Sequence, residues 1–279
     1  GDEFTFKTEA SDNIGIEIVT VEYWFGTGAH TNSTTDLIST HYLLTITVPH
    51  TLAPLNYLFH ISDDSGNWNL SQTTVLPVLD NDRPSLIEDR SPTKGTTGDP
   101  FLFNITIGDN IQFYTATVEY WFGTGLHRNV TMEGEGPFVL HIMLPLDSLD
   151  AMHYILHMND TSKNWNQTKE SSVEISDNDM PYFGTETTPS SATTGDSLTF
   201  SVSVLDNIGV QIVTVEYWFG TESKTNVSMT HNVGYSYTIP IPENSLAKLH
   251  YIYHACDLSG NWNLSSVRYL EILDNDKPS

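Results

Sequence analysis

The sequence predicts an all-β protein of three tandem β-sandwich repeats of 97 residues that form an extended rod. Three observations lead to this prediction: an in-register internal repeat, apolar residues that alternate with period two, and turn residues between the alternating segments. The chain has 279 residues, enough for three domains of about 100 residues each. Hydrophobic residues make up 38% of the chain, so each repeat can form its own core.

The repeat is visible in four short motifs, each of which occurs three times at a spacing of 97 residues. Along one repeat they are Asp-Asn-Ile, Val-Glu-Tyr-Trp-Phe-Gly, Asn-Trp-Asn and Asp-Asn-Asp. A proline follows each Asp-Asn-Asp motif, at Pro84, Pro181 and Pro278. We therefore predict repeats at residues 1–82, 83–179 and 180–279.

The third copy shows the strands expected within one repeat. Several of its segments alternate between apolar and polar residues, turns rich in Gly, Asn, Asp and Pro separate them, and no apolar pattern of helical period appears. We predict strands at Leu198–Val204, Ile212–Phe219, Tyr235–Ile241, His250–Ala255 and Val267–Leu273. Short strands at this spacing are typical of a seven-stranded sandwich.

Successive side chains of a strand point to opposite faces, so the sequence also predicts a core face and an outer face. The residues predicted to face the core of copy one are Val19, Val21, Tyr23, Phe25, Tyr57, Phe59 and Ile61. On the outer face, Glu22, Trp24 and His60 either pack across strands or make a lateral contact with another chain or ligand. A second tryptophan, Trp68 and its equivalents Trp165 and Trp262, is expected to seal the end of the core.

The motifs resemble those of a known group. Asp-Asn-x-Gly after an early strand, Asp-x-Ser-Gly-Asn near the end and a closing Asp-Asn-Asp-x-Pro resemble the immunoglobulin-like (Ig-like) modules of bacterial and archaeal surface proteins. The Asp-Asn-Asp-x-Pro junction also resembles the calcium linker of cadherins. Copy two departs from the pattern at Gln112 and Lys163, where the other copies have glycine. These changes concern the turn geometry and leave the aspartates in place.

The aspartates are expected to gather where two modules meet. In an Ig-like sandwich the loop after the second strand and the loop between the last two strands lie at one end. Asp109 and Asp160 should therefore lie at the leading end of copy two, where Asp80 and Asp82 of the linker enter. Calcium takes about 6–8 oxygen ligands, which carboxylates, asparagine side chains and carbonyls supply. The alternative is that these residues only form turns. The predicted calcium ligands are Asp12, Asp63, Asp80, Asp82, Asp109, Asp160, Asp177, Asp179, Asp206, Asp257, Asp274 and Asp276.

Composition excludes several kinds of partner. The formal net charge is −24, from 35 acidic and 11 basic residues, which argues against nucleic acids and against anionic membrane surfaces. The single cysteine, Cys256, cannot form an internal disulfide. No run of about 18 apolar residues is present, so we expect no membrane insertion.

Asn-x-Ser/Thr sequons suggest an exported, glycosylated surface. Two sequons per copy recur in register, although Asn, Ser and Thr are also common in β-turns. The candidate glycosylation sites are Asn32, Asn69, Asn104, Asn129, Asn159, Asn166, Asn226 and Asn263.

The sequence therefore predicts a structural, non-enzymatic segment of an extracellular surface fibre, stalk or adhesin, stiffened by calcium. The clustered carboxylates recur at every junction, whereas catalysis needs one unique concave site. Its expected partners are copies of itself joined head to tail, or further repeats of a longer chain. Copy one begins at the residue aligned with Gly98 and lacks the equivalent of residues 86–97, which a longer chain or a neighbouring subunit would supply. The alternative function is a module that binds surface glycans or a partner protein.

Overall fold

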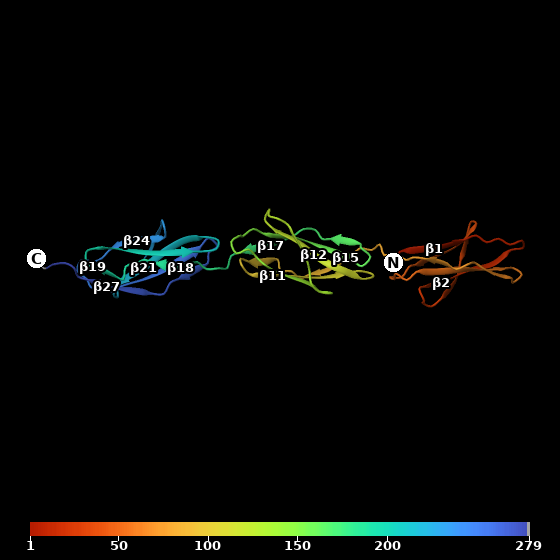
Figure 1. The fold of residues 1–279 in the computed structure, drawn as a ribbon, viewed down its shortest axis with the longest axis horizontal. Helices are drawn as coiled ribbons and strands as arrows, with labels where there is room; N and C mark the ends of the chain where they lie inside the picture. The colour runs from red at the N-terminus through yellow and green to blue at the C-terminus, as the bar shows by residue number, and fades with distance from the viewer. Residues whose placement is uncertain (278–279) are drawn as a thin grey trace.

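The computed structural model describes residues 1–277 and consists of three β-sandwiches placed end to end in a rod (Figure 1). All regular elements in these residues are strands. The predicted all-β fold, the three repeats and the extended shape are thus confirmed. Pro278 and Ser279, which the sequence assigned to the third repeat, lie outside the described residues.

Copy two shows the complete sandwich. One sheet has the order β14-β11-β9 and the other the order β10-β17-β15-β12-β13, with β16 paired to β15. The strands are β9 (Ser85–Asp89), β10 (Lys94–Thr96), β11 (Pro100–Gly108), β12 (Phe113–Phe122), β13 (Arg128–Thr131), β14 (Phe138–Met143), β15 (Met152–Asp160), β16 (Trp165–Gln167) and β17 (Ser171–Ser176). The first segment is divided between the sheets: β9 pairs antiparallel with β11, and β10 pairs parallel with β17. This division ties the two sheets together at one edge.

Copy three repeats this arrangement. Its strands are β18 (Tyr182–Glu186), β19 (Ser191–Thr193), β20 (Ser197–Leu205), β21 (Val210–Phe219), β22 (Thr225–Ser228), β23 (Thr230–His231), β24 (Tyr235–Pro240), β25 (Leu249–Asp257), β26 (Trp262–Leu264) and β27 (Arg268–Leu273). The five strands predicted for this copy are confirmed, with ends that differ by at most two residues. The strands that the alternation did not reveal are β18, β19, β22, β23 and β26, all of five residues or fewer.

Copy one has the same plan without the first segment. Its strands are β1 (Glu3–Thr8), β2 (Ile16–Phe25), β3 (Thr31–Thr34), β4 (Asp36–Ile38), β5 (His41–Thr47), β6 (Leu55–Asp63), β7 (Trp68–Leu70) and β8 (Thr74–Leu76). The sheet order is β1-β5-β4 in one layer and β3-β2-β6-β7, with β8 on β6, in the other. Where β10 would lie, a hollow opens between the sheets, lined in part by Phe4, Leu55, Leu76 and Val78.

The core lies between the two sheets of each copy. Val19, Val21 and Phe59 are buried, and the other predicted core residues of copy one pack against them. Five residues form the buried cluster of copy one, against sixteen in each of the other copies. The prediction that the second tryptophan seals the core was wrong, because Trp68, Trp165 and Trp262 are 62%, 55% and 51% exposed.

Candidate metal centre at the module junctions

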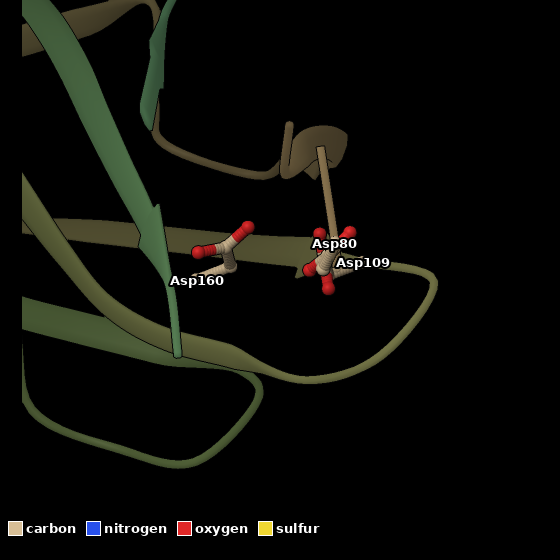
Figure 2. A group of neighbouring side chains, drawn as sticks. All are labelled: Asp80, Asp109 and Asp160. Carbon is tan, nitrogen blue, oxygen red and sulfur yellow. The ribbon is translucent and has the colours of Figure 1, made fainter. Parts of the chain in front are cut away.

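Three aspartates from three separate segments meet at the junction of copies one and two (Figure 2). Asp80 lies in the linker between β8 and β9, Asp109 follows β11, and Asp160 ends β15. One carboxylate oxygen of each lies within 4.8 Å of the others. Asp160 is only 2% exposed, and the other two are half-buried. Three carboxylates this close repel one another unless protons or a cation neutralise them.

The junction of copies two and three has the same arrangement. Asp177 of the linker, Asp206 after β20 and Asp257 at the end of β25 also bring three oxygens within 4.8 Å of one another. Asp257 is fully buried. The repetition of the group in a second pair of modules shows that the 97-residue repeat specifies the geometry.

Each loop aspartate holds its own turn, Asp109 through one carboxylate oxygen and Asp160 through both. Asp109 Oδ1 accepts hydrogen bonds from the backbone N–H groups of Ile111 and Gln112, both at 2.9 Å. Asp160 Oδ1 accepts from the backbone N–H of Asn164 at 2.8 Å, and its Oδ2 accepts from Asn164 Nδ2 at 2.7 Å. The turn-forming role weighed from the sequence is therefore present, but it uses only part of the acceptor capacity of these carboxylates.

At both junctions, other side-chain oxygens are buried without a hydrogen-bond partner. At the first junction these are Asp80 Oδ2, Asp109 Oδ2 and Asn110 Oδ1, and at the second Asp177 Oδ2, Asp206 Oδ2 and Asn207 Oδ1. A buried acceptor without a donor is costly, and a buried anion more so. The donor set at each junction contains only oxygens, with no His or Cys in either group among the described residues. Such a set fits a hard cation such as Ca²⁺ and does not fit zinc.

Each linker has a second aspartate, Asp82 or Asp179. Unlike Asp80 and Asp177, these two do not belong to the groups of three carboxylates. Asp82 Oδ2 accepts a hydrogen bond from Asn110 Nδ2 at 2.8 Å. Asp179 Oδ2 accepts from Asn207 Nδ2 at 3.2 Å and from Thr97 Oγ1 at 3.1 Å. Each of these aspartates binds the amide nitrogen of its asparagine and so orients the amide. The amide oxygen is left without a hydrogen-bond donor.

Asn110 and Asn207 are site residues that the sequence analysis did not single out. The signal was available, because both belong to the repeated Asp-Asn-Ile motif. Asn207 also reaches across the junction, where its Nδ2 donates to the carbonyl oxygen of Leu146 at 2.7 Å. The same nitrogen donates to Asp177 Oδ1 at 3.2 Å, so Asn207 contacts both the preceding module and a member of the carboxylate group.

The aspartates at the two ends of the rod are not gathered in this way. Asp12 Oδ2 accepts from the N–H groups of Ile14 and Gly15, and Asp63 accepts from Ser65 and Asn67. Asp274 and Asp276 both accept from Thr194 Oγ1 at 3.4 Å. Within residues 1–277 no third carboxylate joins either pair. A complete group forms only where a linker meets the next module.

Hydrogen bonds favour the charged form of Asp177 even without a cation. Burial by itself raises the pKa of this carboxyl, but the N–H of Asp179 and the side chains of Asn207 and Thr97 donate to it and lower the pKa below its usual value. At the open end, hydrogen bonds from the side chain and backbone of Asn67 lower the pKa of Asp63 in the same direction. Both residues are therefore carboxylates at neutral pH.

On the predicted outer face, Glu22, Trp24 and His60 contact side chains of the same copy. The Trp24 ring stacks on His30 with centroids 3.9 Å apart. Glu22 accepts from His30 Nδ1 at 2.6 Å and from His60 Nε2 at 2.7 Å, and these bonds lower its pKa. Copy two repeats the set, and copy three replaces the first histidine with Lys224, whose Nζ lies 2.5 Å from Glu216. This favours cross-strand packing over a lateral contact.

The predicted sequons fall into two structural classes. Asn32, Asn129 and Asn226 are exposed on the short strands β3, β13 and β22. Asn166 and Asn263 are half-buried at the junctions, and Asn69 is exposed at the open end of copy one. Of the remaining two, Asn159 is exposed and Asn104 is half-buried.

Comparison with known proteins finds likeness only among solved structures. No known protein family and no curated protein matches the sequence. An E-to-A variant of the three titin Ig domains I67–I69 aligns over 99% of this chain and 94% of its own, with 14% identity and a TM-score of 0.49. A tetra-tandem repeat from the extending region of a large adhesion protein aligns over 95% of this chain and 70% of its own, with 16% identity and a TM-score of 0.38. The described residues contain no helix long and apolar enough to cross a membrane.

Proposed function

We propose that this chain is a structural segment of an extracellular fibre, stalk or adhesin whose Ig-like repeats are stiffened by calcium at the junctions. The observation that carries the proposal is the set of buried, unpartnered oxygens that recurs at both internal junctions. Asp80, Asp109 and Asp160, with Asn110 Oδ1, would hold one ion, and their counterparts in the next junction would hold a second. The exposed sequons in register, at Asn32, Asn129 and Asn226, support an extracellular location.

Stiffening follows from where the ligands come from. Asp80 belongs to the linker, whereas Asp109 and Asp160 belong to the body of copy two. An ion bound by all three offsets the repulsion among the carboxylates and fixes the linker to the module. The angle between modules is then set by the coordination geometry. Without the ion, the same carboxylates repel and the linker is freer to move.

Head-to-tail joining uses the same chemistry. Asp274 and Asp276 correspond to the linker pair, and Asp12 and Asp63 to the loop pair, so the two ends are complementary halves of one site. A contact between such unlike ends does not close on itself and builds a filament. Further repeats of a longer chain would make the same contact within one molecule.

The test is a calcium titration of the purified chain by calorimetry, combined with small-angle scattering with and without a chelator. We expect two ions per chain and a distribution of intramolecular distances that broadens when calcium is removed. A folded chain that takes up no calcium at millimolar concentration would overturn the proposal.

A binding module is the second candidate, and one observation favours it. Trp68, Trp165 and Trp262 expose more than half of their surface at the same place in each copy. Exposed aromatic rings present an apolar surface that a sugar face or a partner protein can cover. Quenching of tryptophan fluorescence by glycans, lost in Trp165→Ala and Trp262→Ala, would support this role.

A further inference from the structure

The Asn-Trp-Asn motif of each repeat meets the linker at both internal junctions. Asn164 Nδ2 donates to the carbonyl oxygen of Asp80 at 3.1 Å, and Asn166 Nδ2 donates to that of Pro84 at 3.0 Å. In the next junction Asn261 and Asn263 donate in the same way, at 3.3 Å to Asp177 and at 2.8 Å to Pro181. The two asparagines thus hold the linker backbone at its beginning and at its end.

We propose that this pair of asparagines is a clamp that docks the linker without any cation, and that Asn166 and Asn263 serve the clamp and carry no glycan. The contact needs no cation, because the amide nitrogens donate directly to backbone carbonyl oxygens of the linker. It is distinct from the carboxylate cluster, although Asn164 also donates to Asp160 and so joins the two. The clamp therefore holds Asp80 near its place before an ion arrives.

The second asparagine of each clamp is oriented before the linker binds. Its Oδ1 accepts a hydrogen bond from the next N–H of the chain, at 2.9 Å for Asn166 and 2.8 Å for Asn263, which turns Nδ2 to the linker. Asn69 of copy one has the same bond at 2.9 Å, although no linker lies on it in the described residues. A donor fixed in this way loses little conformational freedom on contact.

The pleat of the chain explains why the tryptophan between the asparagines is exposed. Trp165 and Asn166 are adjacent residues of β16, whose side chains point to opposite faces, so Asn166 faces the linker while Trp165 faces away. The linker prolines Pro84 and Pro181 are buried against this end of the module. An N-linked glycan would be attached to Nδ2 of the asparagine. This nitrogen lies 3.0 Å from the carbonyl oxygen of Pro84 in Asn166 and 2.8 Å from that of Pro181 in Asn263, where the linker leaves no room for a sugar. Asn32, Asn129 and Asn226, in contrast, are exposed on short strands.

The test compares one substitution at three equivalent positions. Asn166→Asp and Asn263→Asp keep the oxygen that accepts from the next N–H but replace the donor with a carboxylate oxygen. Asn69→Asp makes the same change, with the same added charge, where no linker is held. Each chain is digested in chelator with a metal-independent protease that cleaves after acidic residues, and cleavage within 80–84 and 177–181 is quantified separately by mass spectrometry.

We expect Asn166→Asp to raise cleavage of the first linker about fivefold, the ratio that corresponds to one hydrogen bond of about 1 kcal/mol. Asn263→Asp should do the same at the second linker only, and Asn69→Asp at neither. Asn166→Ala, which adds no charge, should act in the same direction. Unchanged cleavage in both Asn166 variants would overturn the clamp. A chain that binds no calcium would overturn the proposed function but not the clamp, because the digestion is done in chelator.

The glycan part has its own measurement. Glycopeptide mapping of native material should find Asn166 and Asn263 unmodified. Occupancy at either position in folded protein would overturn this assignment. Occupancy confined to other sequons, such as Asn32, Asn129 and Asn226, would support it.

Discussion

The leading ends of copies one and two have the same loop aspartates at the same repeat positions, but only the end of copy two has a linker on it. Asp109 and Asp160 lie with Asp80 in a half-buried group that has unpartnered oxygens. Their equivalents, Asp12 and Asp63, are more exposed and bond only to their own loops. The comparison shows that a module alone makes turns, and that two modules and a linker are needed to assemble the group of three carboxylates.

The two copies also differ at the edge of the sandwich. In copy two β9 and β10 complete both sheets, whereas copy one has the hollow lined by Phe4 and Val78 in their place. The smaller buried cluster of copy one is the direct consequence. We therefore expect copy one to be the least stable of the three.

The largest effect should come from completing copy one. Fusing residues 86–97 in front of Gly1 should place a strand in the hollow and stabilise copy one by about 3 kcal/mol, the order expected for burying one or two large apolar side chains. Hydrogen exchange resolved by copy would measure this, because it reports the opening free energy of each module separately. A fusion carrying Leu86→Asp is the matched control. Equal protection of copy one with and without the fused segment would contradict the prediction.

The second prediction concerns the proposed calcium site and compares one substitution in two copies. Asp160→Asn should weaken calcium binding at the first junction roughly 10- to 100-fold, since the number of charged ligands sets calcium affinity. Asp63→Asn, the same change at the open end of copy one, should leave the affinity of both junctions unchanged. Calorimetric titration of the two variants beside the unaltered chain measures both effects. Similar losses in both variants would show that the ligands are not those at the junction.

The third prediction concerns acid. The pKa of Asp177 in the folded chain is lowered from its usual 3.8, so the contribution of this carboxylate to stability is fully present above that pH. It is lost as the pH falls from 3.8 through the lowered folded value. In calcium-free solution, the hydrogen-exchange protection of the second junction should therefore decline in this pH range. The decline should be smaller in Asp177→Asn, which has no carboxyl group at position 177 to titrate. Parallel acid profiles of the two chains would contradict the assignment.

The sequence predicted the architecture and the aspartate groups because both depend on repeated, local patterns. Alternation located the long strands such as β21, and the spacing of the motifs brought Asp80, Asp109 and Asp160 to one junction. It could not locate β10, since a three-residue strand has no period of its own. It also could not separate Asp80 from Asp82, because the difference depends on which side chain Asn110 contacts. The orientation of Trp165 required the position of the linker, which alternation alone does not give.

The smallest predicted effect tests the turn in which copy two departs from the repeat. Lys163 has φ 74°, close to φ 81° of Gly66 and φ 95° of Gly260 at the equivalent positions, so the turn is retained at the cost of a strained backbone. A glycine avoids this strain, which favours the folded state, but it loses more conformational freedom on folding. The net effect of Lys163→Gly should be to stabilise copy two by about 0.5–1 kcal/mol. Gly66→Ala makes the reverse change in copy one without adding a charge. A Cβ added at Gly66 meets nothing within 4 Å, so only the backbone conformation is affected. It should destabilise copy one by a similar amount in denaturant unfolding. If Lys163→Gly had no effect while Gly66→Ala was destabilising, the backbone strain assigned to Lys163 would be contradicted.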